Sequence, residues 1–191
     1  KDLRLDNYHK YINEDLHQKL IKKTRVLSFS DFNLDSTKLK SKIEKILNKK
    51  ISSNNQLLDR EILILRISRP NSLDINPPHR DGYLDVWKNT INLWIPIEGC
   101  NNLSSLPLIP KSHFWNEKNI YKTENKGASI NGMNYHVPGI LSYENNNLEM
   151  IRPNPQLGEI IIFTPFLVHG SAINAQTDKT RFSLEVRFPF A

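Results

Sequence analysis

Apolar side chains recur at helical spacing in two early segments, residues 8–24 and 36–50, with lysines on the opposite side of each stripe. The stripes consist of Leu16, Leu20 and Ile21 in the first segment and of Leu39, Ile43, Ile46 and Leu47 in the second. Asp35 or Ser36 can cap the second helix, and residues 26–29 between the two favour a short strand. We expect both helices to pack on the outside of a β-sheet and to contribute stability rather than chemistry.

From residue 60 onward the pattern becomes that of β-strands. Residues 61–67 form a nearly continuous apolar run, which is typical of a buried strand. Residues 90–97 and 180–188 alternate, so each places apolar and polar side chains on opposite faces of a sheet. The alternation separates Leu93, Ile95 and Ile97 from Asn92 and Trp94, and it separates Phe182, Leu184, Val186 and Phe188 from Arg181, Ser183, Glu185 and Arg187. Residues 105–110 and 158–163 predict further short strands.

The order of these elements predicts the fold class. Helices first, followed by many short strands separated by turn signals, indicate an α+β chain, mainly β, built on a jelly roll of two sheets. We expect a single domain over residues 1–191, with a helical flank at 1–58 and the jelly-roll core at 59–191. Within that core, residues 114–147 are rich in Asn, Lys and Glu and predict a long polar loop that covers one mouth of the fold as a lid.

Composition narrows the class of protein. The 191 residues, 38% hydrophobic and 24% charged, are typical of an ordinary soluble globular protein. The single cysteine, Cys100, excludes an intrachain disulfide and a cysteine-based zinc site, and it fits a reducing, cytoplasmic location. No apolar run approaches the ~20 residues that span a membrane, so no membrane partner is expected. No secretory signal is visible, and the chain begins with Lys1 rather than methionine, which leaves the start of the natural protein open.

The net charge of +6 lies wholly in residues 1–50, which hold 13 Lys/Arg and 7 Asp/Glu, whereas residues 51–191 hold 13 of each. The lysines of residues 38–50 are compatible with a patch that binds the phosphates of nucleic acid. No aromatic side chain lies among these lysines to stack on bases. We therefore favour a solvated helix face and expect no nucleic-acid partner.

The segment His79-Arg80-Asp81 is the main candidate for chemistry. Side chains at i and i+2 of an extended strand point to the same side, so His79 and Asp81 can reach one point in space while Arg80 points away. A third ligand has to come from a facing strand, and His169, which ends a predicted strand and precedes Gly170, fits that place. Two histidines and one carboxylate form the facial triad of non-haem Fe(II) oxygenases. For each histidine taken alone, a surface or hydrogen-bonded structural role is the alternative.

Arg181 and Ser183 follow on the polar face of the last predicted strand. Four polar side chains in a row on a central strand are costly to bury unless they meet partners. One partner that fits is a dicarboxylate such as 2-oxoglutarate, because Arg181 can grip a carboxylate in bidentate fashion and Ser183 adds a further donor. The other end of that molecule would then reach the metal. The alternative for Arg181 is a surface salt bridge with Asp178 or Glu185.

Taken together, these motifs resemble those of the Fe(II)/2-oxoglutarate-dependent dioxygenase superfamily, and within it the phytanoyl-CoA dioxygenase-like branch. The resemblance covers about residues 61–188 and leaves the first sixty residues outside. It is carried by His79-x-Asp81, His169, Arg181-x-Ser183, Ile91-Asn92-Leu93-Trp94-Ile95-Pro96-Ile97, Asn102-Leu103 and Ile109-Pro110-Lys111-Ser112-His113. The closing pattern at 181–188 is similar to that of members linked to small-molecule and sugar tailoring.

The resemblance implies a double-stranded β-helix in which Fe(II) is held by His79, Asp81 and His169. It also implies that 2-oxoglutarate is bound by Arg181 and Ser183. The further residues that it implies are Asn92 and Trp94 in the cofactor pocket, Arg80 and Tyr83 at its rim, and Arg187 as a second carboxylate partner for cofactor or substrate. His136 is a candidate substrate contact only because it lies in the predicted lid. For Trp94, packing in the core is the alternative.

The expected activity is hydroxylation of a small polar metabolite, of sugar or natural-product type, by O2 and 2-oxoglutarate with release of succinate and CO2. The asparagines of the predicted lid favour a hydroxylated or charged substrate, although such loops are also common in AT-rich genomes. They are Asn125, Asn131, Asn134 and Asn145 to Asn147. Two alternatives remain: a cupin-type metal-dependent enzyme that does not use 2-oxoglutarate, and a non-enzymatic binding module with a basic helical arm. Nothing in the sequence specifies an oligomeric state.

Overall fold

The computed structural model describes residues 4–25, 27–32, 34–55, 57–71, 76–124, 127–130, 133–171 and 173–191. The α-helices are α1 (Glu14–Lys23) and α2 (Ser36–Leu47), and short 3-10 helices lie at Leu5–Lys10, Phe29–Phe32, Asp81–Tyr83, Asp85–Trp87, Ser112–Phe114 and Glu117–Asn119. The strands are β1 (Asn54–Asn55), β2 (Arg60–Glu61), β3 (Leu63–Ser68), β4 (Thr90–Glu98), β5 (Ile120–Lys122), β6 (Ala128–Ile130), β7 (Met133–Tyr135), β8 (Ile140–Tyr143), β9 (Ile161–Phe163) and β10 (Arg181–Pro189). The described chain is mainly β, with antiparallel sheets and few helices, as the sequence predicts.

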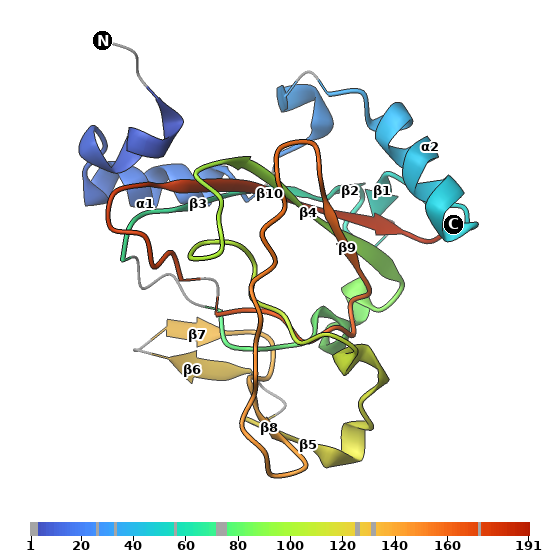
Figure 1. The fold of residues 1–191 in the computed structure, drawn as a ribbon. Coiled ribbons are helices and arrows are strands. Elements are labelled where there is room, and N and C mark those ends of the chain that lie inside the picture. Colours follow the sequence, from blue (N-terminus) through green and yellow to red (C-terminus); the bar gives the residue numbers. More distant parts are fainter. Residues whose placement is uncertain are drawn as a thin grey trace.

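A four-stranded antiparallel sheet in the order β3-β10-β4-β9 forms the centre of the molecule (Figure 1). Strand β10 pairs with both β3 and β4, so that Glu185 lies between Ile64 and Trp94. The alternation predicted for residues 90–97 and 180–188 is confirmed, since the apolar side chains enter a core on one face and the polar ones line a cavity on the other.

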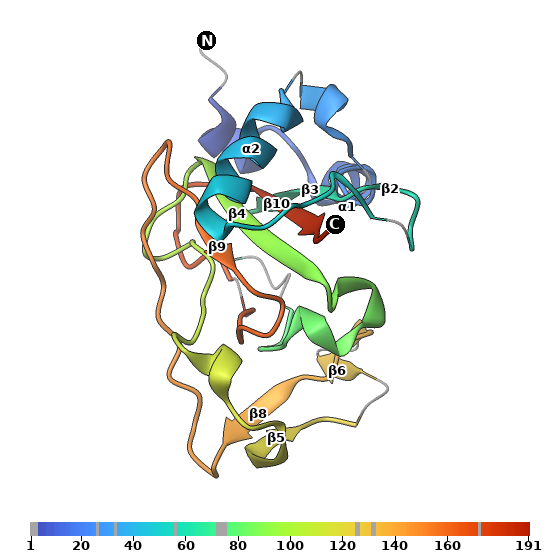
Figure 2. The ribbon, with the colours of Figure 1, turned by 90° about the vertical axis from the view of Figure 1, so that its right-hand side faces the viewer.

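The apolar face of this sheet is buried beneath the N-terminal segment. Phe188 of β10 stacks on Phe29, with ring centroids 5.9 Å apart, and Ile43 of α2 belongs to the same core. Each side chain buried in this way contributes about 1.5–3 kcal/mol to folding. Figure 2 shows α2 on one side of the sheet, with the β5–β8 pair and β6 on the other. The helix therefore packs outside the sheet, as expected.

Capping residues set where the two helices begin and end. The side chains of Asn13 and Asp35 accept hydrogen bonds from backbone N–H groups in the first turns of α1 and α2. Asn48 has a left-handed backbone (φ 51°), which ends α2 three residues earlier than predicted. Among the described residues, no helix has both the length and the apolar character needed to cross a membrane.

The strand predicted at residues 26–29 is wrong for the part that the structure describes. Residue 26 lies outside the described residues, and Leu27 makes only an isolated bridge with Leu63. A 3-10 turn follows instead, because the Asp31 carboxylate accepts hydrogen bonds from the backbone N–H and the hydroxyl of Ser28. A local side-chain contact therefore overrides the apolar pattern here.

Residues 114–147 contain strands that the sequence pattern does not predict. Their described part contains two antiparallel pairs, β5–β8 and β6–β7. Ile120 and Ile140 anchor this region, since both are buried in a second core with Val168. Asn125 and Asn131, expected to give the lid its polar character, lie outside the described residues. The strand predicted at 105–110 is reduced to isolated bridges of Leu108 with Ile151 and His169.

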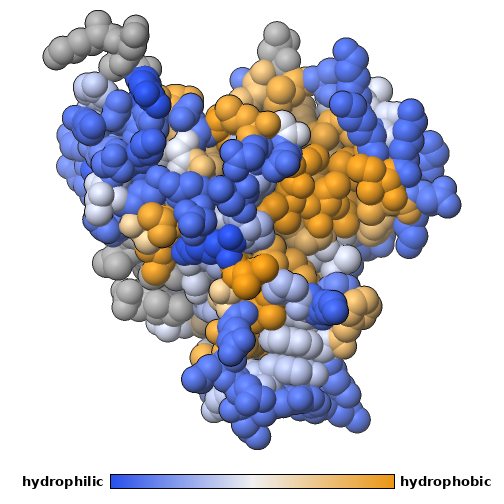
Figure 3. Space-filling model, in the orientation of Figure 1, coloured by the Kyte–Doolittle hydropathy of each residue, from blue (hydrophilic) through white to orange (hydrophobic). Residues whose placement is uncertain are grey.

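The surface in Figure 3 shows an apolar area between β9 and α2. Leu47, Ile160 and Ile162 are partly buried side chains that pack on the main core from this region. Hydrophilic side chains dominate the surface around β5 and β8. The main core contains the apolar side chains of β4 and β10, whereas their polar side chains line the cavity described below, on the opposite face of the sheet.

Candidate metal centre

His79, Asp81 and His169 converge beside the polar face of the sheet. His79 and His169 form an antiparallel bridge, in which each backbone N–H donates to the carbonyl oxygen of the other, at 2.8 and 3.1 Å. One potential ligand atom from each of the three residues lies within 4.8 Å of the others, and all three residues are buried. Gly170 (φ +132°) permits this approach, since a Cβ there would lie 2.4 Å from the carbonyl oxygen of Pro77.

Asp81 is positioned by a turn and not by a continuous strand. Arg80 is extended (φ −112°, ψ 127°), but a 3-10 turn begins at Asp81, where the Gly82 N–H donates to the carbonyl oxygen of Pro165 at 2.9 Å. The single extended residue is enough to keep the carboxylate on the side of His79 and to turn Arg80 away. His79 and Asp81 therefore point to the same side, as expected from their i, i+2 spacing. The strand expected to continue through Asp81 is replaced by a 3-10 turn.

Both imidazoles present the same nitrogen to the carboxylate. Nδ1 of His79 lies 2.7 Å from the carbonyl oxygen of Pro77, and Nδ1 of His169 lies 2.9 Å from that of Leu167. Because a carbonyl oxygen only accepts hydrogen bonds, each Nδ1 carries the proton and a neutral ring exposes a lone pair at Nε2. These Nε2 atoms lie 3.3 and 3.9 Å from oxygens of Asp81. Burial, followed by the neighbouring His79, lowers the pKa of His169 to about 4.

Asp81 is held through one of its two oxygens. Oδ2 accepts hydrogen bonds from Asn92 Nδ2 at 2.7 Å and Arg187 Nε at 3.0 Å, and Arg187 Nη2 lies 2.9 Å away. Burial alone would raise the pKa of Asp81, but the adjacent guanidinium of Arg187 holds it well below its usual value. The carboxylate is therefore ionised, and Oδ1 is the oxygen nearest His79. Two lone pairs and an anion that face one another in a buried space form a cation site.

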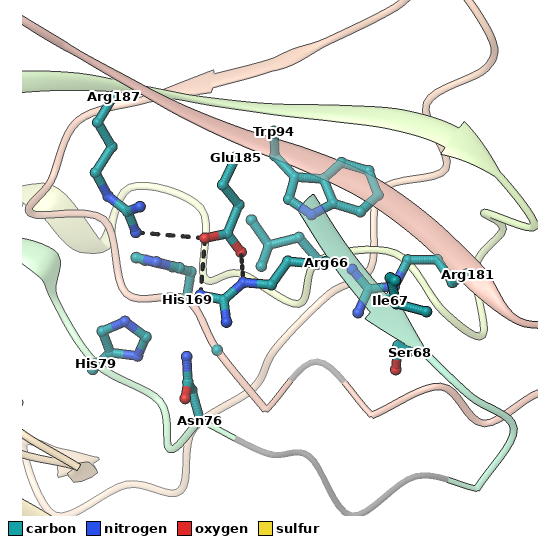
Figure 4. A pocket seen from close by; sticks show the side chains of 12 residues that line it. Arg66, Ile67, Ser68, Asn76, His79, Trp94, His169, Arg181, Glu185 and Arg187 are labelled. Carbon is teal, nitrogen blue, oxygen red and sulfur yellow. Dashed lines mark hydrogen bonds and ion pairs between the residues drawn. The ribbon is translucent and has the colours of Figure 1, made fainter. Parts of the chain in front are cut away.

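A cavity extends from the two histidines along the polar face of β10 (Figure 4). Its lining consists of Arg66, Ile67, Ser68, Asn76, His79, Trp94, Leu106, His169, Gly170, Arg181, Glu185 and Arg187. The buried indole Nε1 of Trp94 and the buried hydroxyl of Ser68, both in this lining, have no hydrogen-bond partner among the described residues. A buried donor without a partner is costly, so both atoms indicate a ligand with acceptor oxygens.

Arg181 and Ser183 lie in the same part of the structure. Arg181 Nη1 donates to Ser183 Oγ at 2.7 Å, and the guanidinium lies 5.9 Å from the ring centroid of Trp94. Burial lowers the pKa of Arg181 to about 10, which leaves it charged at neutral pH. Arg181 is only 4% exposed, so it does not lie at the surface, where the alternative placed its salt bridge.

Arg66 and Glu185 form a bidentate ion pair in the cavity, although the sequence pattern does not identify them as functional residues. Arg66 Nε and Nη2 donate to the two carboxylate oxygens of Glu185 at 2.9 and 3.0 Å. Arg187 Nη2 lies 3.6 Å from the same carboxylate. The sequence contains part of the signal that could identify them, since Glu185 shares a polar strand face with Arg181 and Arg66 interrupts an apolar run. Their meeting depends on the register of β10 with β3, where Ser183 faces Arg66.

The residues expected at the rim of the site are distributed differently. Arg80 is buried, donates to the backbone carbonyl oxygen of Ser112 at 2.6 Å and pairs with Glu117 at 2.9 Å. Tyr83 donates to the same Glu117 at 3.4 Å, and burial raises its pKa. His136 is exposed. None of the three belongs to the described lining of the cavity. Arg80 and Tyr83 brace the turn at Asp81, and a substrate contact by the three remains a prediction.

The Arg66–Glu185 pair should make the free energy of unfolding depend on pH. Burial would raise the pKa of Glu185, but Arg66 and Arg187 lower it to about 2, from 4.5 in the unfolded chain. Because the folded pKa is the lower one, this stabilisation is fully present above pH 4.5 and is lost as the pH falls through 2. Between pH 5 and 2, we expect the free energy of unfolding to fall by about 2–3 kcal/mol more for the wild type than for Glu185→Gln. Urea denaturation of the metal-free proteins measures this. An equal fall in the free energy of unfolding of both proteins between pH 5 and 2 would contradict it.

Fold and site together define a mainly β, antiparallel chain with a buried His–Asp–His group suited to a metal ion. Comparisons with protein-family models and with curated proteins give no match. Among solved structures, the chain is similar to AviO1 from Streptomyces viridochromogenes Tue57, with a TM-score of 0.52 and 17% identity over 79% of this chain and 56% of AviO1. The chain thus spans little more than half the length of AviO1. At this identity the likeness shows a related fold.

A second similar structure, EvdMO1, has a TM-score of 0.43 and 18% identity over 67% of this chain and 26% of its own length.

Proposed function

We propose that this chain is an Fe(II)- and 2-oxoglutarate-dependent oxygenase built on a double-stranded β-helix. One observation carries the proposal: His79 and His169, which form a buried group of metal-ligand candidates with Asp81, line a cavity that is also lined by the buried Arg181. The likeness to AviO1 supports the fold, and the antiparallel sheet is compatible with one half of a jelly roll.

The chemistry of the donor set fits Fe(II). Two neutral imidazoles and one carboxylate favour Fe(II), Mn(II) or Zn(II) over metals that prefer sulfur ligands. Each imidazole is oriented through its Nδ1 hydrogen bond, and the carboxylate is oriented through Asn92 and Arg187. Such outer contacts fix ligand geometry at metal sites. His79, Asp81 and His169 would therefore hold the ion with little rearrangement.

The charges of the cavity fit a dianionic cosubstrate. Three guanidinium groups, of Arg66, Arg181 and Arg187, meet two carboxylates, of Glu185 and Asp81. A divalent ion at the histidines adds further positive charge to this excess. A dicarboxylate offsets it and supplies acceptors for the unpartnered groups of Trp94 and Ser68. In this proposal Arg181 and Ser183 bind the carboxylate far from the metal.

When bound, iron and 2-oxoglutarate supply an oxidative decarboxylation by O2 that yields succinate, CO2 and a hydroxylated substrate. The residues of the chain perform the positioning. His79 and His169 present Nε2, while Arg187 keeps Asp81 ionised and, together with Asn92, orients its carboxylate. His79, Asp81 and His169 are each 5% exposed or less, which limits access of water to the site. We propose a small polar metabolite of sugar or natural-product type as substrate, in keeping with the polar composition of residues 114–147.

Anaerobic titration of the purified protein with Fe(II) and then 2-oxoglutarate tests the proposal. A weak visible charge-transfer band should appear only when both are present, and O2 should then yield succinate. Iron binding without any response to 2-oxoglutarate would favour a cupin-type enzyme that uses the same metal ligands. Salt-sensitive binding of nucleic acid carried by residues 38–50, with no effect of changing His79, would favour the binding module instead.

A further inference from the structure

The Arg66–Glu185 ion pair occupies the part of the cavity between the histidines and Arg181. Figure 4 shows the Arg66 guanidinium below Glu185 on the His169 side of the cavity, with Arg181 on the other side. The side chains of Arg66 and Glu185 are 28% and 19% exposed, so both charges are largely removed from water. Any molecule that bridges the histidines and Arg181 has to pass this pair.

Stability alone is a poor explanation for a charged pair at this place. Taking two charges out of water costs several kcal/mol per ion, and apolar residues of similar volume are often as stabilising. The bidentate contact uses one edge of the Arg66 guanidinium and fixes the plane of the group. Glu185 thus offsets the charge of Arg66 and also orients it. This arrangement suits a guanidinium that has to receive an anion repeatedly in one geometry.

We propose that Arg66, oriented by Glu185, is a second anion contact of the cavity and binds the carboxylate of the 2-oxo acid group at the histidine end. This inference rests on the proposed function and adds a residue that neither motif of the sequence contains. The cavity then has two separate carboxylate contacts, Arg66 at one end and Arg181 with Ser183 at the other. It should select a 2-oxo acid with two carboxylates over one with a single carboxylate.

The roles of Arg66 and Glu185 predict effects of opposite sign. Arg66→Gln removes the attraction for the carboxylate, so binding should weaken roughly 10- to 100-fold, the usual cost of a charged hydrogen bond. Glu185→Gln removes a nearby negative charge but keeps one side-chain oxygen that can accept a hydrogen bond from Arg66, so binding should tighten by about threefold or more. Arg66→Lys keeps the charge without the bidentate geometry and should recover part of the loss. A purely structural pair would instead weaken binding in either variant.

The test measures anaerobic binding of 2-oxoglutarate and of 2-oxobutyrate, which lacks the distal carboxylate, to the iron-loaded proteins by calorimetry. Arg66→Gln should weaken both ligands by the same factor, whereas Arg181→Gln should weaken only 2-oxoglutarate. Arg69→Gln serves as the matched control, because Arg69 pairs with Glu14 at 2.6 Å outside the cavity lining. This control should bind both ligands like the wild type.

The outcomes separate this inference from the proposed function. If wild-type protein binds iron but neither 2-oxo acid, the proposed function fails, and the role of Arg66 fails with it. If the wild type binds 2-oxoglutarate and Arg66→Gln binds it equally well, only the role of Arg66 is overturned. Equal losses in Arg66→Gln and Glu185→Gln would also overturn it. Iron titration and thermal unfolding of each variant verify that the metal site and the fold are intact.

Discussion

Replacing Asp81 by alanine is expected to abolish iron binding and, with it, succinate formation. The change removes the only carboxylate of the described His–Asp–His group and leaves two imidazoles. Losing a residue that merely supports a ligand typically costs about 10- to 100-fold in metal affinity, so losing a ligand should cost more. Arg187 and Asn92 would also lose their shared acceptor. Titration with Fe(II), followed by competition with a chelator, measures the loss.

Asp85→Ala is the matched control for Asp81→Ala. Asp85 lies four residues further on, with a side chain that is 87% exposed and paired only with Lys88 among the described contacts. The Asp85→Ala protein should bind iron and form succinate like the wild type. Near-wild-type iron affinity in Asp81→Ala would remove the metal assignment. Normal iron binding together with full turnover in Asp81→Ala would contradict the oxygenase proposal as a whole.

Replacing Arg181 by alanine should raise the apparent KM for 2-oxoglutarate strongly while leaving iron affinity close to that of the wild type. Truncating one partner of a buried, hydrogen-bonded charge pair costs about 2–5 kcal/mol, or roughly 30- to 5,000-fold in affinity. Ser183 would lose the donor that it shares with the ligand site. Because Arg181 is not a member of the His–Asp–His group, the effect should appear in cosubstrate binding rather than in metal binding. Succinate formation at varied 2-oxoglutarate measures it.

Lys179→Gln provides the control for Arg181, since it removes a nearby positive charge whose side chain is exposed. It should leave the KM for 2-oxoglutarate within about twofold of the wild type, because exposed charges interact weakly with distant groups. An unchanged KM in Arg181→Ala would contradict a carboxylate contact at this residue. Loss of iron binding in Arg181→Ala would point to a disturbed fold, which thermal unfolding of the variant would reveal.

Local patterns predicted the elements of the fold better than their arrangement. The apolar stripe containing Ile43 predicted α2, and the alternation around Leu184 predicted the two faces of β10. The short strand predicted at residues 26–29 is wrong for their described part, and the strands within 114–147 are not predicted by the sequence pattern. In the first segment the Asp31 carboxylate stabilises a turn, and in the second Ile120 and Ile140 gain a core only after distant segments pack together.

The spacing of residues in the sequence determined the ingredients of the candidate site. One extended residue between His79 and Asp81 places both on one side, and alternation places Arg181 and Ser183 on one face. These relations involve consecutive residues, so they follow from backbone geometry alone.

Only the tertiary structure decided which of these groups meet. The bridge between His79 and His169, the contact of Asn92 and Arg187 with Asp81, and the Arg66–Glu185 pair all join residues far apart in the chain. Each depends on the register in which strands pair, and a slip of one residue would turn every side chain of a strand to the other face. The sequence by itself therefore determined which side chains share a strand face. The packing of the sheet determined that Asn92 and Arg187 hold the carboxylate of Asp81.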